Sequence, residues 1–160
     1  MRQPEPAGSA AADAAKLLRE ARTAALATLD LASGAPYVSL VTVALDADGA
    51  PLLLLSKLAR HTANLDADPR VSLLFTPAGR APGDPLATAR VTVMGRIEPT
   101  ASATARSRFL ARHPEAEMYA SFADFRFFAL HVQCAHFIGG FGRIVDVAGA
   151  ELAAAVMRTG

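Results

Sequence analysis

The sequence predicts a mainly β fold, a Greek-key barrel with short α-helices at its periphery. About six short segments rich in Val, Leu and Thr have the length and patterning of strands. Turn residues separate these segments, and only a few brief stretches have helical spacing. Closing an antiparallel sheet removes its exposed edges, which favours a barrel. Periodicity alone leaves a sandwich equally open.

The first half of the chain is expected to contain a helix, four strands and a second short helix. Leucines and alanines form one apolar face among Lys16, Arg19 and Glu20, which predicts a helix over residues 13–21. Strands are expected at residues 23–29, 36–45, 52–55 and 71–76, with a short helix at 58–65 between the last two. Asp48 and Gly49 supply a hairpin turn, because Asp-Gly tolerates positive φ.

The second half begins with an exposed loop at residues 77–85, which holds three prolines and two glycines. A strand at 88–97, a helix at 102–112, a helical turn at 115–122 and strands at 126–133 and 135–138 are expected to follow. Pro114 stops the helix, and the Gly-rich residues 139–142 interrupt the last strands.

Composition indicates one globular domain, because 52% of the residues are hydrophobic and 19% charged. We expect a flexible N-terminal tail at residues 1–12, a folded domain at 13–148 and a C-terminal tail, helical in part, at 149–160.

The net charge of +1 gives no reason to expect nucleic acid or an anionic membrane as partner. No apolar run approaches the ~20 residues of a transmembrane helix. The single cysteine, Cys134, excludes an internal disulfide and suits the cytoplasm.

Polar side chains gather where the strand at 52–55 meets the following helix. Ser56, Lys57, Arg60 and His61 would place a hydroxyl, two cations and an imidazole beside the helix N-terminal amides. Arg60 would bind phosphate oxygens as a fork, with single hydrogen bonds from Ser56 and His61. A surface helix with a polar first turn explains the same residues equally well.

Other candidate side chains have simpler interpretations. Arg90 opens a strand, where a solvated arginine is the commoner explanation. His131 is expected to be exposed or at an interface rather than to bind a metal or haem. Neither His131 nor His136 has a known zinc spacing with Cys134, so no metal site is expected. No P-loop, nucleophile elbow or dinucleotide fingerprint occurs, and no catalytic residue is assigned.

Three blocks carry a family resemblance: ATLDLASGAPYVSLV at 27–41, SKLARHTANLDADPRVSLLF at 56–75, and the pair RVTVMG and IGGFGR. They resemble the FMN-binding split-barrel flavoproteins, the pyridoxamine 5′-phosphate oxidase-like family. With RFLARHP and FADFRFF, the chain is most similar to the HugZ-like subgroup, which includes a haem-utilisation protein and plant glutamyl-tRNA reductase-binding proteins. The resemblance implies a split β-barrel homodimer with FMN in a cleft between subunits.

The resemblance also implies seven cofactor-binding residues. Three would hold the FMN phosphate and four would lie along the flavin ring: Ser56, Arg60 and His61, then Val38, Ser39, Thr42 and Arg90. A donor such as Arg90 near N1 and O2 would stabilise the anionic reduced flavin.

The resulting hypothesis is an FMN-dependent oxidoreductase acting on an unknown small molecule. One alternative is a HugZ-type protein that binds and degrades haem. Another is a non-catalytic binding protein with a vestigial cofactor cleft. Pyridoxamine phosphate oxidation is not expected, because the true oxidase places a flavin-contacting Trp on its last strand and this chain has no Trp.

Overall fold

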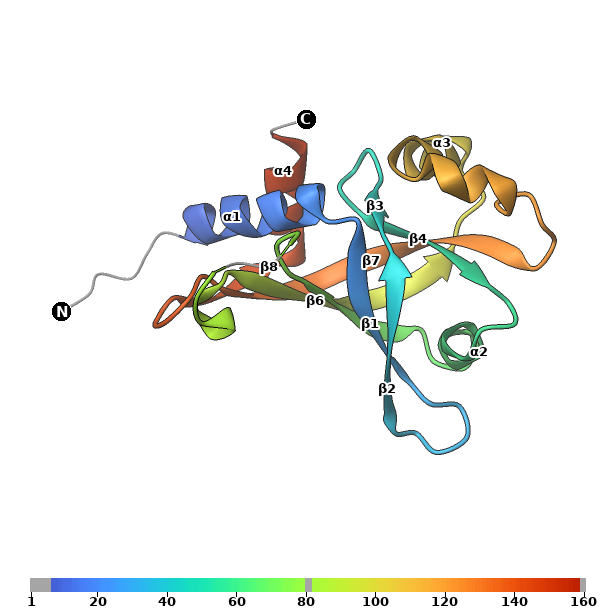
Figure 1. Cartoon of the computed structure of the whole chain (residues 1–160), viewed down its shortest axis with the longest axis horizontal. Helices are drawn as coiled ribbons and strands as arrows, with labels where there is room; N and C mark the ends of the chain where they lie inside the picture. Colours follow the sequence, from blue (N-terminus) through green and yellow to red (C-terminus); the bar gives the residue numbers. More distant parts are fainter. Residues whose placement is uncertain (1–6, 80–81, 159–160) are drawn as a thin grey trace.

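The computed structural model describes residues 7–79 and 82–158 and confirms a mainly β fold with peripheral helices (Figure 1). Its elements in chain order are α1 (Ala7–Glu20), β1 (Thr23–Leu29), β2 (Pro36–Thr42), β3 (Ala44–Leu45), β4 (Pro51–Ser56), α2 (Arg60–Ala67), β5 (Arg70–Phe75), η1 (Pro85–Ala87), β6 (Arg90–Pro99), α3 (Ala103–Arg112), η2 (Pro114–Met118), β7 (Phe125–Ile138), β8 (Ile144–Ala148) and α4 (Gly149–Met157). Within these ranges, none of the helices is long and apolar enough to cross a membrane.

The strands form one antiparallel sheet that curls into a barrel. The strand order is β2-β1-β5-β6-β7-β4-β3, and β8 pairs with β7 beside this path. The two ends of the order, β2 and β3, are consecutive in the chain and separated only by Val43. The Val43 amide donates to the carbonyl oxygen of Arg22, 3.0 Å away, just before β1. The ends of the sheet are therefore brought together.

Strand β7 is the longest strand and pairs with three others. Its first residues pair with β4, its last residues pair with β8, and β6 lies along its other edge. The sequence predicted two strands here; the structure has one, with a register irregularity opposite Met94 and Gly95. Strand β8 was not predicted, because its five residues directly follow the Gly-rich segment that was expected to end the sheet.

Two apolar clusters form the core. The larger fills the barrel and includes the fully buried Leu26, Leu73 and Phe137. Helices α1 and α4 pack against each other and against this cluster (Figure 1). The smaller cluster lies under α3, where Phe109 packs with residues of β4 such as Leu52.

Residues 7–12, predicted as part of a flexible N-terminal tail, are helical in the structure. Helix α1 begins at Ala7, and Ala10 and Ala11 are fully buried in the main core. Alanine-rich sequence near a terminus was interpreted as a tail, but small side chains allow a helix to approach a sheet closely. Residues 1–6 lie outside the described part of the chain.

Gly95 is expected to be indispensable for the pairing of β6 with β7. A Cβ atom there would lie 1.9 Å from the carbonyl oxygen of His131. Gly95→Ala should therefore lower the free energy of unfolding by about 1–3 kcal/mol, the range for overpacking. The control Arg96→Ala, at the exposed neighbouring position, should change it by less than about 0.5 kcal/mol. Equal denaturant midpoints for Gly95→Ala and the unmodified protein would contradict the prediction.

Candidate functional site

Buried polar side chains fix helix α2 against the barrel. The Asn64 side chain donates to Thr28 Oγ1 at 3.0 Å and accepts from the Leu31 amide at 2.9 Å. The Thr62 hydroxyl donates to the carbonyl oxygen of Ser56 at 2.6 Å. Asn64 and Thr62 are both almost fully buried. The first turn of α2 is thereby held at the ends of β1 and β4.

Arg60, the predicted phosphate ligand, is paired with a carboxylate. Its Nη2 and Nε lie 2.7 and 2.8 Å from Asp30 Oδ1. Asp30, of which only 7% is exposed, also accepts hydrogen bonds from the amide and hydroxyl of Ser33. The hydrogen bonds from Ser33 and Arg60 lower the pKa of Asp30 below its ordinary value of 3.8. The Arg60 guanidinium also lies 5.1 Å from the centre of the Tyr37 ring.

Ser56 and His61 also have protein partners. The Ser56 hydroxyl donates to Asp124 Oδ2 at 3.2 Å. His61 Nδ1 lies 3.0 Å from the hydroxyl of Ser39, and burial lowers the pKa of His61 below its ordinary value of 6.5. His61 is therefore mainly neutral at pH 7, when it adds no positive charge to an anion site.

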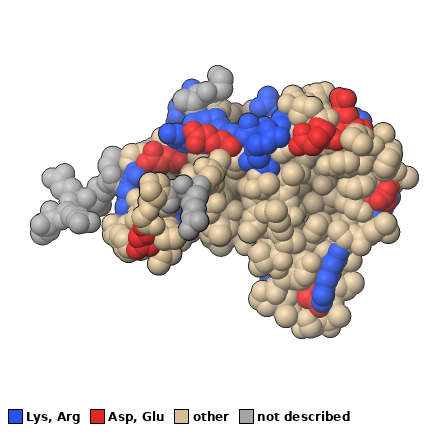
Figure 2. Space-filling view, in the orientation of Figure 1, with Lys and Arg blue, Asp and Glu red and all other residues tan. Residues whose placement is uncertain are grey.

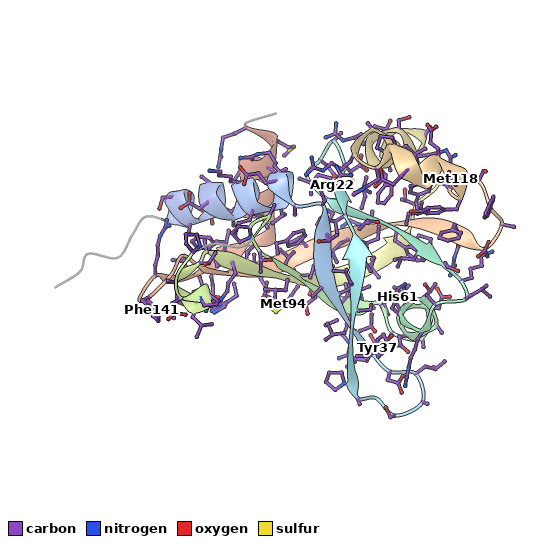
Figure 3. All side chains as sticks on the ribbon, in the orientation of Figure 1. Arg22, Tyr37, His61, Met94, Met118 and Phe141 are labelled. Carbon is purple, nitrogen blue, oxygen red and sulfur yellow. The ribbon has the colours of Figure 1, made fainter. Side chains whose placement is uncertain are left out.

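The predicted phosphate donors Arg60 and His61 thus lie in the first turn of α2, and the Tyr37 ring of β2 lies close to Arg60 (Figure 3). The structure also brings two carboxylates to this site that sequence analysis missed, Asp30 and Asp124. The position of Asp30 directly after a strand and before a Ser-Gly turn is the one local signal that could have identified it. An anion bound here would compete with Asp30 for Arg60.

Of the remaining predicted residues, Ser39 faces α2, whereas Val38, Thr42 and Arg90 lie on the opposite face of the sheet. Alternation along β2 puts Val38 and Thr42 on one side and Ser39 on the other. We call the outward face of β2, β1, β5, β6 and β7 the open face; it is formed by Val38, Leu40, Thr42, Ala25, Ala27, Ser72, Leu74, Arg90, Thr92, Met94, Cys134 and His136.

Large apolar side chains are exposed on the open face. The exposed fractions are 62% for Val38, 76% for Leu40, 39% for Leu74 and 36% for Met94. Figure 3 shows Met94 on the side of the sheet away from α1. Figure 2 shows charged side chains mainly along the upper edge of the view and largely uncharged surface below them. Several exposed apolar side chains on one face of a sheet are typical of a binding or association surface.

Arg90 is the cation at one end of the open face. Its Nη1 donates to the carbonyl oxygens of Leu86 at 2.9 Å and Thr88 at 3.2 Å. It also lines a pocket of about 290 Å³ together with Thr76 and Pro85. Within residues 7–79 and 82–158, no carboxylate forms a salt bridge with Arg90. Unlike Arg60, it can therefore accept an anionic ligand group without displacing an acidic side chain.

The described residues contain no cluster of three or more His, Cys, Asp or Glu side chains able to hold a metal ion by themselves.

Comparison with known proteins places the fold in a family. The model of the CREG β-barrel family matches residues 5–152. The chain belongs to the CREG β-barrel family. The split-barrel fold implied by the sequence resemblance is confirmed, because this CREG-family chain shares it with its structural neighbours.

Two relatives of this CREG-family chain carry haem in their names. The chloroplast heme oxygenase HOZ of Arabidopsis thaliana is 37% identical over 110 residues, which are 67% of this chain and 33% of that protein. A solved heme-binding protein of Mycobacterium smegmatis is 36% identical with a TM-score of 0.83, covering 96% of this chain and 62% of that one. The chain thus spans about a third of the plant relative and less than two-thirds of the mycobacterial one.

A third likeness concerns the fold alone. A Clostridium acetobutylicum protein related to general stress protein 26, of the pyridoxine phosphate oxidase family, has a TM-score of 0.68 and 13% identity. The alignment covers 91% of this chain and 98% of that one. The CREG-family chain therefore has the split-barrel architecture of these proteins.

The Asp30–Arg60 pair predicts an acid-sensitive site. A carboxyl whose pKa is lowered by folding stabilises the protein above its ordinary pKa, here 3.8, and this stabilisation is lost as pH falls through the lower folded value. Asp30→Asn should lower thermal stability at pH 7 and flatten its decline below pH ~4. The exposed Glu117→Gln serves as control and should follow the unmodified protein. A decline as steep in Asp30→Asn as in the unmodified protein would refute the assignment.

Proposed function

We propose that this protein binds haem on its open face and acts as a homodimer. The observation that carries the proposal is an exposed apolar sheet face in a chain whose relatives at 36–37% identity are named for haem. Oxygenase activity belongs by name to the plant relative, of which the alignment covers 33%, and the proposal for this chain is haem binding.

The residues of the open face fit haem chemically. The macrocycle needs an apolar surface, and Met94 of β6 is 36% exposed on this face, opposite Cys134 of β7. The propionates need cations, and Arg90 at the end of the same face has no described carboxylate partner. When bound, haem supplies iron chemistry, while the protein positions the macrocycle and its propionates.

FMN is the second candidate, because the fold neighbours include the pyridoxine phosphate oxidase family. Ser56, Arg60 and His61 would hold its phosphate, main-chain groups near Val38, Ser39 and Thr42 would lie beside the ring, and Arg90 would tune it. Bound FMN supplies hydride and electron transfer. The phosphate would have to share Arg60 with Asp30, and Ser56 with Asp124. This competition is the reason that haem is the first candidate.

The homodimer is supported by the part of the open face on β2, β1 and β5. Val38, Leu40 and Leu74 would expose much apolar surface to water in a monomer. Two copies packed on these strands would cover this surface. The proposed haem would lie beside the interface, over β6 and β7, where Arg90 is placed.

Absorbance titrations test haem against FMN directly. Haemin should give a Soret band that saturates with a Kd of about 1 μM or tighter, ~8 kcal/mol of binding free energy. Met94→Glu should weaken haemin binding at least about tenfold, because the macrocycle would have to desolvate a carboxylate. The matched control Met118→Glu, 80% exposed on η2, should bind as the unmodified protein does. Saturable FMN binding without haemin binding would reverse the order of the two candidates.

Light scattering tests the homodimer. The expected mass is twice the chain mass of 16.7 kDa at micromolar concentration. Leu40→Glu should give the single-chain mass, since it places a charge in the centre of the proposed interface, whereas Met118→Glu should leave the dimer intact. A monomeric unmodified protein would overturn this part of the proposal.

A further inference from the structure

We propose that the His136 ring would bind the haem iron and that Asp146 holds this ring in the orientation that such binding requires. This inference rests on the proposed haem function and names the residue that carries it. His136 lies on β7, directly opposite Thr92 of β6 on one side and Asp146 of β8 on the other. The row Leu74, Thr92, His136 and Asp146 crosses the open face from β5 to β8.

The hydrogen bond of His136 leaves one ring nitrogen available. Nδ1 lies 2.7 Å from Asp146 Oδ1, and 41% of the His136 side chain is exposed. With the proton on Nδ1, the lone pair of Nε2 is free for a metal, and Nε2 has no hydrogen-bond partner among the described residues. Carboxylates that accept from the second nitrogen fix the tautomer of a ligating histidine and raise its basicity.

None of the other three histidines combines an available ring nitrogen with a carboxylate partner at the other nitrogen among the described residues. His113 is 2% exposed, and both of its ring nitrogens have protein partners, including the carbonyl oxygen of Val43. His61 is half-buried on the far side of the sheet, with the hydroxyl of Ser39 at its Nδ1. His131 is exposed on β7 opposite Arg96, and no described carboxylate pairs with it. His131 is therefore the natural control.

The surroundings of His136 suit a macrocycle. Ile138 of β7 pairs with Ile144 of β8, and both lie one step along the same face from His136. Ile144 is 64% exposed and offers apolar contact beside the imidazole. Arg90 is the partner of Ile138 on β6, so its Cα is diagonal to that of His136, about 7–8 Å away. A haem ligated by His136 can therefore direct a propionate to Arg90.

The alternative explanation of the His136–Asp146 contact is a cross-strand pair that binds no ligand. Exposed pairs of this kind contribute little to stability. Such a pair would leave every haem spectrum unchanged when His136 is replaced. The haem absorbance spectrum of a His136 variant therefore separates the two explanations, whereas a stability measurement does not.

The experiment compares haemin complexes of the unmodified protein, His136→Ala, His131→Ala and Asp146→Asn, after circular dichroism has shown that all four are folded. His136→Ala should lose affinity by about 100-fold or more and shift the Soret maximum, and added imidazole should restore the original spectrum. Asp146→Asn should retain haem with about 10- to 100-fold lower affinity and, after reduction of the complex with dithionite, a lower iron–histidine stretching frequency in resonance Raman spectra. His131→Ala should match the unmodified protein.

The outcomes separate this inference from the function on which it rests. An unmodified protein that fails to bind haemin overturns the proposed haem function. Haemin binding by His136→Ala with unchanged affinity and Soret maximum overturns only the assignment of His136. Loss of the ligand signature in His131→Ala, with His136→Ala unaffected, would move the ligand to His131.

Discussion

Closure of the barrel is the constraint on which the rest of this structure depends. Because β2 and β3 are joined through Val43 alone, the sheet must curl, and each strand turns one face inward. The inward face is filled by side chains such as Leu26, Leu73 and Phe137. The helices pack elsewhere: α1 and α4 against each other, and α3 against β3 and β4 (Figure 1). None of the described helices covers the outward face of β2, β1 and β5, where Val38, Leu40 and Leu74 are exposed. Exposed apolar side chains gathered on one face are typical of a binding or association surface.

Charge pairing separates the two polar centres of the molecule. At α2, Asp30 neutralises Arg60, and Asp124 accepts the Ser56 hydroxyl, so the centre is largely satisfied within the chain. On the open face, Arg90 hydrogen-bonds to the carbonyl oxygens of Leu86 and Thr88, and no carboxylate among the described residues pairs with it. An incoming anionic group gains more beside an uncompensated guanidinium than beside a paired one. This difference favours a ligand with carboxylate groups that can contact Arg90.

Elements with complete local signals were predicted closely. Strand β1 has the predicted bounds, because an alternation of small and large apolar residues matches a half-buried strand. Helix α3 begins one residue late and ends where expected: the Ser102 hydroxyl caps its N-terminus, accepting from the Ala105 amide at 3.1 Å, and Pro114 stops it. Strand β7 was predicted as two strands, at 126–133 and 135–138, because an irregularity in pairing depends on the partner strand rather than on local pattern. Strand β8 was missed, because it follows the Gly-rich segment.

The sequence by itself determined the fold class, most strands and the gathering of Ser56, Arg60 and His61 at a helix start. These features follow from periodicity and from contacts within a few residues. Only the tertiary structure decided which charges are already paired and which residues share a face. Asp30 pairs with Arg60, which is 30 residues away in the sequence. His136 contacts Asp146 on β8, a strand that was not predicted from the local sequence pattern. The register of strand pairing decides such side-chain contacts, because a shift of one residue turns a side chain to the opposite face of the sheet.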